Sequence, residues 1–263
     1  MTRRRDVIVG GSATLFGAAL PASVHAQASK PFPLASELES GDLLWPKEPG
    51  TFIPYRYVGN TEPTADVLEW ETSRDAAIAE IRKNLTMENV ALLNELKDLT
   101  YARFRARYLN GSEPGTLVEY GRGGVAAVGH VAVVLIGSDS VPRVVEAVPP
   151  KVIVSTYDQW VAARPKEVVW QGRLRGKSGD ERHAVAMEAL KYDTRPYDFW
   201  KFNLDDETGF YCSKLVWLAA MRAIGLAVDG NPDPKRIFWL SPKQILNSDA
   251  IDTILTQGDY TFD

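Results

Sequence analysis

A run of aliphatic and β-branched residues at positions 130–136 constrains the fold of this chain more than any other feature. The run begins with His130 and ends before Gly137, and a second apolar run at 143–148 follows the turn residues 138–140. Two adjacent strands joined by so short a turn form an antiparallel hairpin. The sequence therefore predicts an antiparallel hairpin as the basis of a sheet.

Further strands and helices are predicted on the C-terminal side of this hairpin. Short strands are expected at 152–154 and 168–170, with a short helix at 157–163 between them. A polar-faced helix at 180–192 precedes an apolar helix at 212–224. The predicted fold class is α+β, with one antiparallel sheet packed against helices.

Residues 64–109 differ from the rest, because they contain few Gly or Pro and are rich in Ala, Leu, Glu, Lys and Arg. Two helices fit this segment, at 65–84 and 87–108, with Thr86 as the N-cap of the second. Three leucines at helical spacing predict one buried stripe: Leu92, Leu96 and Leu99. We expect a helical hairpin that is inserted into a single domain and lies on it.

The first 28 residues are predicted to be an export signal. Residues 3–5 are all Arg, residues 7–22 form a mildly apolar stretch, and residues 26–28 read Ala-Gln-Ala, a small-x-small cleavage site. Arg4-Arg5 resembles a twin-arginine signal. An ordinary secretory signal with one extra arginine is the alternative.

The location of the mature protein follows from this signal. The apolar stretch is too short to span a bilayer comfortably, since spanning takes about 18 or more such residues. We therefore expect cleavage near Ala28, a mature domain at 29–263 without a transmembrane segment, and a periplasmic or extracellular location.

Charge and residue counts exclude several classes of site. The formal net charge is -4, and no cluster of Lys and Arg follows the N-terminus, so a nucleic-acid partner is not expected. The mature chain has only His130, His183 and Cys212 as Cys/His ligands, which argues against a zinc site. Residues 121–124 are glycine-rich but lack the length and the lysine of a phosphate-binding loop. The sequence predicts neither a metal nor a cofactor.

Cys212 is the single cysteine of the chain and cannot form an intramolecular disulfide. A lone thiol in an exported protein is either buried and inert or kept for its reactivity. The apolar helix that follows places Cys212 at a helix N-terminus, where unpaired N–H groups and the helix dipole favour a thiolate. The backbone N–H of Cys212 is also placed to hold an oxyanion.

His130 and Glu146 lie on the two strands of the predicted hairpin. Glu146 is flanked by apolar residues, and a buried carboxylate is costly unless it is paired. Neighbouring antiparallel strands can place an imidazole beside a carboxylate, which would orient the ring and stabilise its cationic form. A partly buried His130 with an ordinary structural role is the alternative. His183 stands among charged residues and is interpreted as a surface residue.

The order of several short motifs resembles the permuted NlpC-type papain-like cysteine peptidases, the YiiX/YebB-like branch. In that branch a Gly-Asp strand comes first, a His-Val strand and a strand ending in Glu-Ala follow, and a Tyr-Asp-Phe loop precedes a Tyr-Cys-Ser helix. The chain carries these motifs in this order: Gly41-Asp42, Gly129-His130-Val131, Glu146-Ala147, Tyr197-Asp198-Phe199 and Tyr211-Cys212-Ser213. The resemblance implies a circularly permuted papain-like fold and spans residues 39–224, interrupted by the helical insertion.

The resemblance implies Cys212 as nucleophile, His130 as base and Glu146 as the residue that orients the base. It also suggests that Tyr197 donates its hydroxyl to the oxyanion, with an ordinary packing role as the alternative. Tyr211 and Asp42 are further candidates for contacts with the oxyanion or the substrate, although Asp42 also suits a turn.

The chain departs from the family pattern in two respects. Lys214 replaces the acidic residue that often follows Cys-Ser, and the segment at 64–109 is longer than usual, so it could cover the cleft. The acidic residues 205–207 could bind a cationic substrate group or be solvated. Four aromatic residues could line an apolar cleft, although most of them are expected to belong to the core: Phe199, Trp200, Phe202 and Phe210.

These observations lead to three hypotheses. The first is an amide hydrolase that acts through an acyl-enzyme, with small peptides such as peptidoglycan fragments as leading substrates. The second is a thioesterase, lipid hydrolase or acyltransferase that uses the same site on an acylated substrate. The third is a binding module whose site is idle.

Overall fold

The computed structural model describes residues 31–47, 64–83, 85–87, 89–104, 129–236, 239–258 and 260. It contains a six-stranded antiparallel sheet in the order β4-β3-β2-β1-β5-β6. The strands are β1 Leu43–Lys47, β2 Ala132–Ile136, β3 Pro142–Val148, β4 Lys151–Thr156, β5 Val168–Leu174 and β6 Ile251–Leu255. The predicted α+β class is thereby confirmed. No described helix is long and apolar enough to cross a membrane.

The predicted hairpin is confirmed as β2 and β3, which pair in antiparallel register with Val133 opposite Val145. Pro46 lies within β1, opposite Val169. A proline lacks an N–H donor and is tolerated where a strand is unpaired on one side. This condition holds because β1 pairs with β2 only through Leu43 and Leu44.

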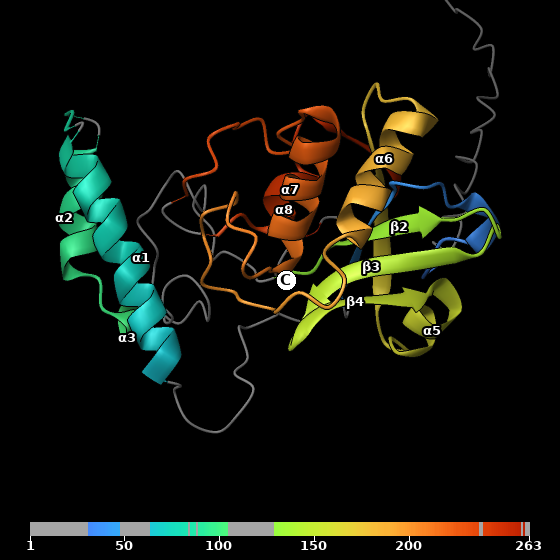
Figure 1. Cartoon of the computed structure of the whole chain (residues 1–263), viewed down its shortest axis with the longest axis horizontal. Coiled ribbons are helices and arrows are strands. Elements are labelled where there is room, and N and C mark those ends of the chain that lie inside the picture. Colours follow the sequence, from blue (N-terminus) through green and yellow to red (C-terminus); the bar gives the residue numbers. More distant parts are fainter. Residues whose placement is uncertain are drawn as a thin grey trace, which may run out of the picture.

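Alternating residues of the strands face two apolar layers. On one face, Val133 and Val145 pack in a large core with helices α6 (Gly179–Leu190) and α7 (Cys212–Ile224). On the other face, Val134 and Val144 pack with residues of α5 (Tyr157–Ala162). Figure 1 shows α6 and α7 on one side of the sheet and α5 on the other. Because Val145 and Ala147 point into the α6–α7 core, Glu146 between them points to the side of α5.

The helical insertion lies beside α7 and α8 (Pro242–Leu246), at the end of the molecule away from α5 (Figure 1). It consists of α1 Thr64–Lys83, α2 Val90–Asp98 and α3 Tyr101–Phe104. The first predicted helix is confirmed, whereas the second is broken at Leu99, which has extended backbone angles. Positions 105–109 lie outside the described residues.

Two details of the second helix were predicted wrongly. Thr86 is not its N-cap, because Thr86 and Asn89 close a turn in which the Thr86 N–H donates to Asn89 Oδ1 at 2.8 Å, and the helix begins after Asn89. The buried stripe contains Leu93 rather than Leu92, next to Leu96 and Leu99. The short helix α8 and the strand β6 were not predicted.

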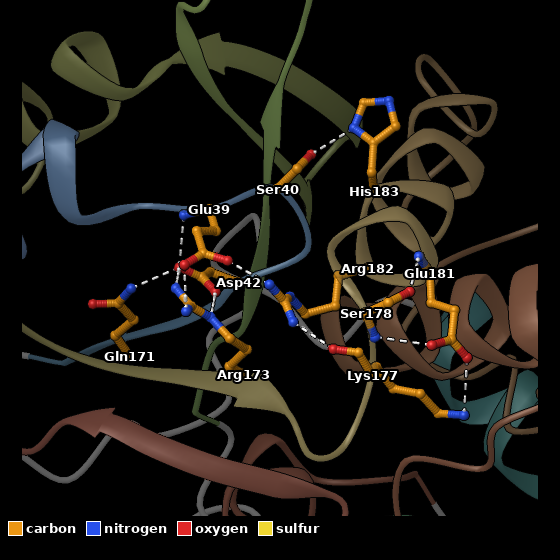
Figure 2. Close-up of polar contacts among 10 residues, drawn as sticks. All are labelled: Glu39, Ser40, Asp42, Gln171, Arg173, Lys177, Ser178, Glu181, Arg182 and His183. Carbon is orange, nitrogen blue, oxygen red and sulfur yellow. Dashed lines mark hydrogen bonds and ion pairs between the residues drawn. The ribbon is translucent and has the colours of Figure 1, made fainter.

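A polar network connects the turn before β1 to β5 and α6 (Figure 2). Asp42 is fully buried, and its carboxylate accepts hydrogen bonds from Arg173 Nε at 2.7 Å and from Gln171 Nε2 at 2.7 Å. Glu39 pairs with Arg173 and with Arg182 of α6. The network therefore connects the central strand to one neighbouring strand and to a covering helix.

Gly41 permits the close approach on which this network depends. Its φ is +84°, and a Cβ at this position would lie 2.3 Å from the Arg182 carbonyl oxygen. Both the backbone conformation and the space therefore require glycine here.

We predict that Asp42→Ala lowers the free energy of unfolding by about 3–5 kcal/mol, because buried Gln171 loses its acceptor and partly buried Arg173 loses one of its two carboxylate partners. Denaturant unfolding followed by tryptophan fluorescence measures this change. Asp139→Ala is the matched control, since Asp139 pairs with Arg143 on the surface and its loss should leave the midpoint nearly unchanged. Equal midpoints for the two variants would contradict a stabilising role of Asp42.

Candidate active site

Cys212 is the first residue of α7, as predicted. Tyr211 is the N-cap, with extended backbone angles, and makes no side-chain cap hydrogen bond. The N–H groups of the first helical turn lack partners within the helix, so they favour negative charge at the thiol. The Cys212 side chain is almost fully buried, and its Sγ lies 3.8 Å from the Gly129 carbonyl oxygen. The thiol is therefore held against the segment that leads into β2.

The structure brings the three predicted side chains together. His130 Nε2 lies 2.7 Å from Glu146 Oε2, and His130 and Cys212 line the same cavity and interact electrostatically. Because Nε2 is bound to the carboxylate, Nδ1 is the nitrogen that remains for the thiol. The predicted Cys-His-Glu geometry is present in the fold.

Glu146 has two further partners that sequence reasoning missed. Its Oε2 accepts hydrogen bonds from Trp160 Nε1 at 3.0 Å and from Arg164 Nη2 at 2.8 Å. The Arg164 guanidinium lies 4.2 Å from the centre of the Trp160 ring and donates to the Trp160 carbonyl at 3.0 Å. These contacts hold the buried carboxylate in place from the side of α5.

A sequence signal for these partners was present. Glu146 was predicted to need a partner, and Trp160 and Arg164 stand at helical spacing in and just after the predicted short helix. What the sequence did not reveal is that this helix covers the face of the sheet to which Glu146 points.

The electrostatics of the site favour an imidazolium–thiolate pair. Burial lowers the pKa of His130, but the hydrogen bonds and charges of Cys212 and Glu146 outweigh it and raise that pKa to about 10. Burial raises the pKa of Cys212, but its hydrogen bond to His130 and the imidazolium charge bring the pKa below its ordinary value. Burial also opposes ionisation of Glu146, yet His130 and Arg164 lower its pKa to about 2. His130 and Glu146 are therefore charged at neutral pH, and their charges favour the thiolate form of Cys212.

A cavity of about 150 Å³ opens beside the thiol. Cys212, His130, Tyr197 and Tyr211 line it, together with a set of mostly apolar residues: Gly129, Ala147, Val148, Pro149, Phe199, Ser213, Trp239 and Pro242. Apart from the Cys212–His130 pair itself, none of the described lining residues is an acid or a base that is charged at neutral pH. The cavity therefore suits an uncharged substrate group.

The two predicted tyrosines both line the cavity, in different ways. The Tyr211 hydroxyl is buried and accepts a hydrogen bond from the Leu240 N–H at 3.1 Å, so it anchors the segment before α8. Tyr197 is half-buried and has its backbone N–H bound to the Pro150 carbonyl at 2.9 Å. The role of the Tyr197 hydroxyl toward an oxyanion stays a prediction.

Asp42 is not part of this cavity, which corrects its candidacy for substrate contacts. The Asp42 carbonyl accepts a hydrogen bond from the Val134 N–H, in the middle of β2. His130, in contrast, lies before the first residue of that strand. Its carboxylate is already bound to Arg173 and Gln171. The alternative role in a turn is the one that the structure supports.

Other charged residues also lie away from the cavity lining. Asp205 and Glu207 pair with Arg222, and half-buried His183 contacts Ser40 Oγ through Nδ1 at 2.9 Å. Lys214 is fully buried and donates to the Lys201 carbonyl at 3.1 Å, and burial lowers its pKa to about 8. The replacement of an acidic residue of the family pattern by Lys214 thus leaves the surroundings of the thiol intact. Among the described residues, no group of His, Cys, Asp and Glu is arranged to hold a metal ion.

A family described as "permuted papain-like amidase enzyme, YaeF/YiiX, C92 family" matches residues 101–257, which contain Cys212, His130 and Glu146. The chain belongs to this family. The family is one of papain-like amidases, and its permuted fold is the one that the motif order predicted. The strand β1 and the helices α1 and α2 precede the matched residues.

Individual relatives are more distant. The chain is 34% identical over 105 residues to the uncharacterized protein YiiX of Escherichia coli strain K12, a match that covers 40% of this chain and 50% of YiiX. The chain thus spans about half the length of that curated relative. It is also similar to a crystal structure described as metalloprotein yiiX from Escherichia coli O157:H7, with 22% identity and a TM-score of 0.42 over 53% of this chain and 87% of that one.

We predict that iodoacetamide alkylates Cys212 at a lower pH than an ordinary thiol with a pKa of about 8.5, because His130 lowers the pKa of the Cys212 thiol. The rate should reach a plateau that extends toward the His130 pKa of about 10. In His130→Ala the alkylation rate should rise at a higher pH than in the wild type, since the substitution removes the imidazolium. A wild-type rate that rises only near pH 8.5 would indicate an idle site.

We also predict opposite effects for the two groups beside the ring. Glu146→Gln should lower the pKa of His130 because it removes an anion, whereas Arg164→Met should raise it because it removes a cation, each by about one unit. NMR titration of the His130 ring measures both. Arg164→Lys keeps the positive charge, so the pKa of His130 in this variant should stay near its wild-type value. Shifts of the same sign in Glu146→Gln and Arg164→Met would contradict this arrangement.

Proposed function

We propose that this protein is a cysteine amidase that uses Cys212 as nucleophile, His130 as acid and base, and Glu146 to orient and charge the imidazole. The observation that supports this most is that His130, bound to Glu146, lines the same cavity as Cys212, which begins α7. Membership of a papain-like amidase family agrees with it.

The proposed reaction has two halves. The Cys212 thiolate attacks the carbonyl carbon of the substrate, and His130 gives its proton to the departing amine, which leaves an acyl-enzyme. His130, now neutral, takes a proton from water, and the resulting hydroxide attacks the thioester. The acid product departs and the thiolate and imidazolium are regenerated. Glu146 stays ionised throughout, since its task is to hold and stabilise the imidazolium.

The negative charge that develops on the carbonyl oxygen needs donors that are already in position. The backbone N–H of Cys212 lies at the start of α7 and has no partner within the helix. Tyr197 lines the same cavity and is the side chain that we assign as the second donor.

Cell-wall peptides are the first substrate class that we propose, from the family and from the predicted export signal. The mostly apolar lining beside the Cys212–His130 pair gives specific support to a second candidate, an acylated substrate such as a thioester or a lipid amide. Cys212 could attack either, because both present a carbonyl carbon with a leaving group. The two classes differ in the acyl group that remains on sulfur.

We further propose that the protein acts outside the cytoplasm. The support is the arginine-rich start, the apolar stretch at 7–22 and the Ala-Gln-Ala site, all of which lie outside the described residues. Mass spectrometry of the protein purified from its native cell would show a chain that starts near residue 29 if the signal is cleaved.

We predict that Cys212→Ala and His130→Ala each lower turnover of an amide substrate by about a thousandfold or more. His183→Ala is the matched control, because His183 contacts Ser40 on the surface of α6 and should retain wild-type turnover. Separate incubation with murein fragments and with acyl-lipids, followed by mass analysis of Cys212, identifies the acyl group that is transferred. Wild-type turnover in Cys212→Ala would disprove the proposed mechanism.

A further inference from the structure

Aromatic side chains of the helical insertion contact the side chains that form one wall of the cavity. Phe199 and Trp239 line the cavity, with their ring centres 5.7 Å apart. Phe104 of α3 packs edge-on against Trp239 at 5.6 Å, and Trp70 of α1 stacks on Phe104 at 4.0 Å. The insertion therefore contacts this wall directly.

A second set of contacts reaches the other half of the same wall. Phe199 packs against Trp200 at 5.0 Å. Trp200 in turn meets Tyr101 at 5.5 Å and Phe104 at 5.9 Å, both from the insertion. Phe199 and Trp239 are thus supported from behind by the same short segment.

These rings are closely packed and almost completely inaccessible. Trp70 and Phe104 have no exposed surface, and Phe199, Trp200 and Trp239 are at most 6% exposed. In a close-packed interior, a change in the volume of one ring displaces its neighbours. A change at Phe104 is therefore expected to move the cavity wall at Trp239.

We propose that the helical insertion is a specificity element, which sets the size of the substrate group accepted beside Cys212 through Phe104 and Trp70. This rests on the proposed function in one respect, that substrates react at Cys212. The group selected is uncharged and apolar, because the described part of the wall offers no ionic partner. Trp70 of α1 precedes the residues matched by the family, whereas Phe104 of α3 lies within them.

The test reads the size of the cavity without requiring turnover. N-alkyl chloroacetamides of increasing chain length label Cys212 at a rate that depends on how well the alkyl group fits. We expect Phe104→Leu to raise the ratio of labelling rates for long over short probes by about threefold to tenfold, the effect of small volume changes in an apolar site. Trp239→Leu enlarges the wall itself and should change the ratio in the same direction.

Leu93→Ala is the matched control, because Leu93 is buried in the same insertion but does not line the cavity. It should leave the ratio unchanged although it also removes buried volume. Thermal unfolding of each variant verifies folding, and Trp70→Phe, a smaller change to the same stack, replaces Phe104→Leu if that variant does not fold.

The outcomes distinguish a failure of the specificity role of the insertion from a failure of the proposed hydrolase function. An unchanged ratio in folded Phe104→Leu and Trp70→Phe overturns the specificity role, whether or not the protein hydrolyses amides. An altered ratio in a protein that turns over neither murein fragments nor acyl substrates supports the role of the insertion in shaping the cavity and refutes the proposed hydrolase. An altered ratio matched by the same change in kcat/KM for long and short acyl amides supports both.

Discussion

The buried charge of Glu146 is the constraint on which the active site depends. A carboxylate on an apolar strand is tolerated only if cationic and hydrogen-bonding groups surround it. Here His130, Trp160 and Arg164 all bind one of its oxygens, from the neighbouring strand segment and from the region of α5. The contacts that stabilise the buried charge of Glu146 therefore also fix the orientation of the imidazole beside the thiol. Folding and the preparation of the nucleophile depend on the same set of contacts.

The two sides of the sheet contribute different parts of the site. The thiol comes from α7, which packs on one face, whereas Trp160 comes from α5 on the other. His130 lies just before β2, at the end of the sheet, where side chains from both faces can reach it. A site at the end of a sheet thus combines a helix dipole from one layer with an ion pair from the other.

Much of this arrangement could be predicted from local sequence. The strand hairpin, the boundaries of α7 and the pairing of His130 with Glu146 follow from apolar periodicity, from the position of Cys212 before an apolar helix and from the need of a buried carboxylate for a partner. The sequence did not decide whether Asp42 forms a turn or contacts the substrate, because its partners Gln171 and Arg173 lie far along the chain. Trp160 and Arg164 were missed for the same reason: the sequence does not reveal which face of a sheet a helix covers. The break at Leu99, a buried residue with extended backbone angles, was not predicted from local propensity.

The position of β1 has a consequence for how the molecule forms. This strand is made early in synthesis, yet it occupies the middle of the sheet, between β2 and β5. Its longest pairing is with β5, on the far side of the whole insertion and of the β2–β4 segment. Such contacts between distant parts of a chain carry a large loop-closure entropy and form slowly. Although β1 can pair with β2 through Leu43 and Leu44, its longer pairing must wait until residues 168–174 have been synthesised, so completion of the sheet does not simply follow the growing chain.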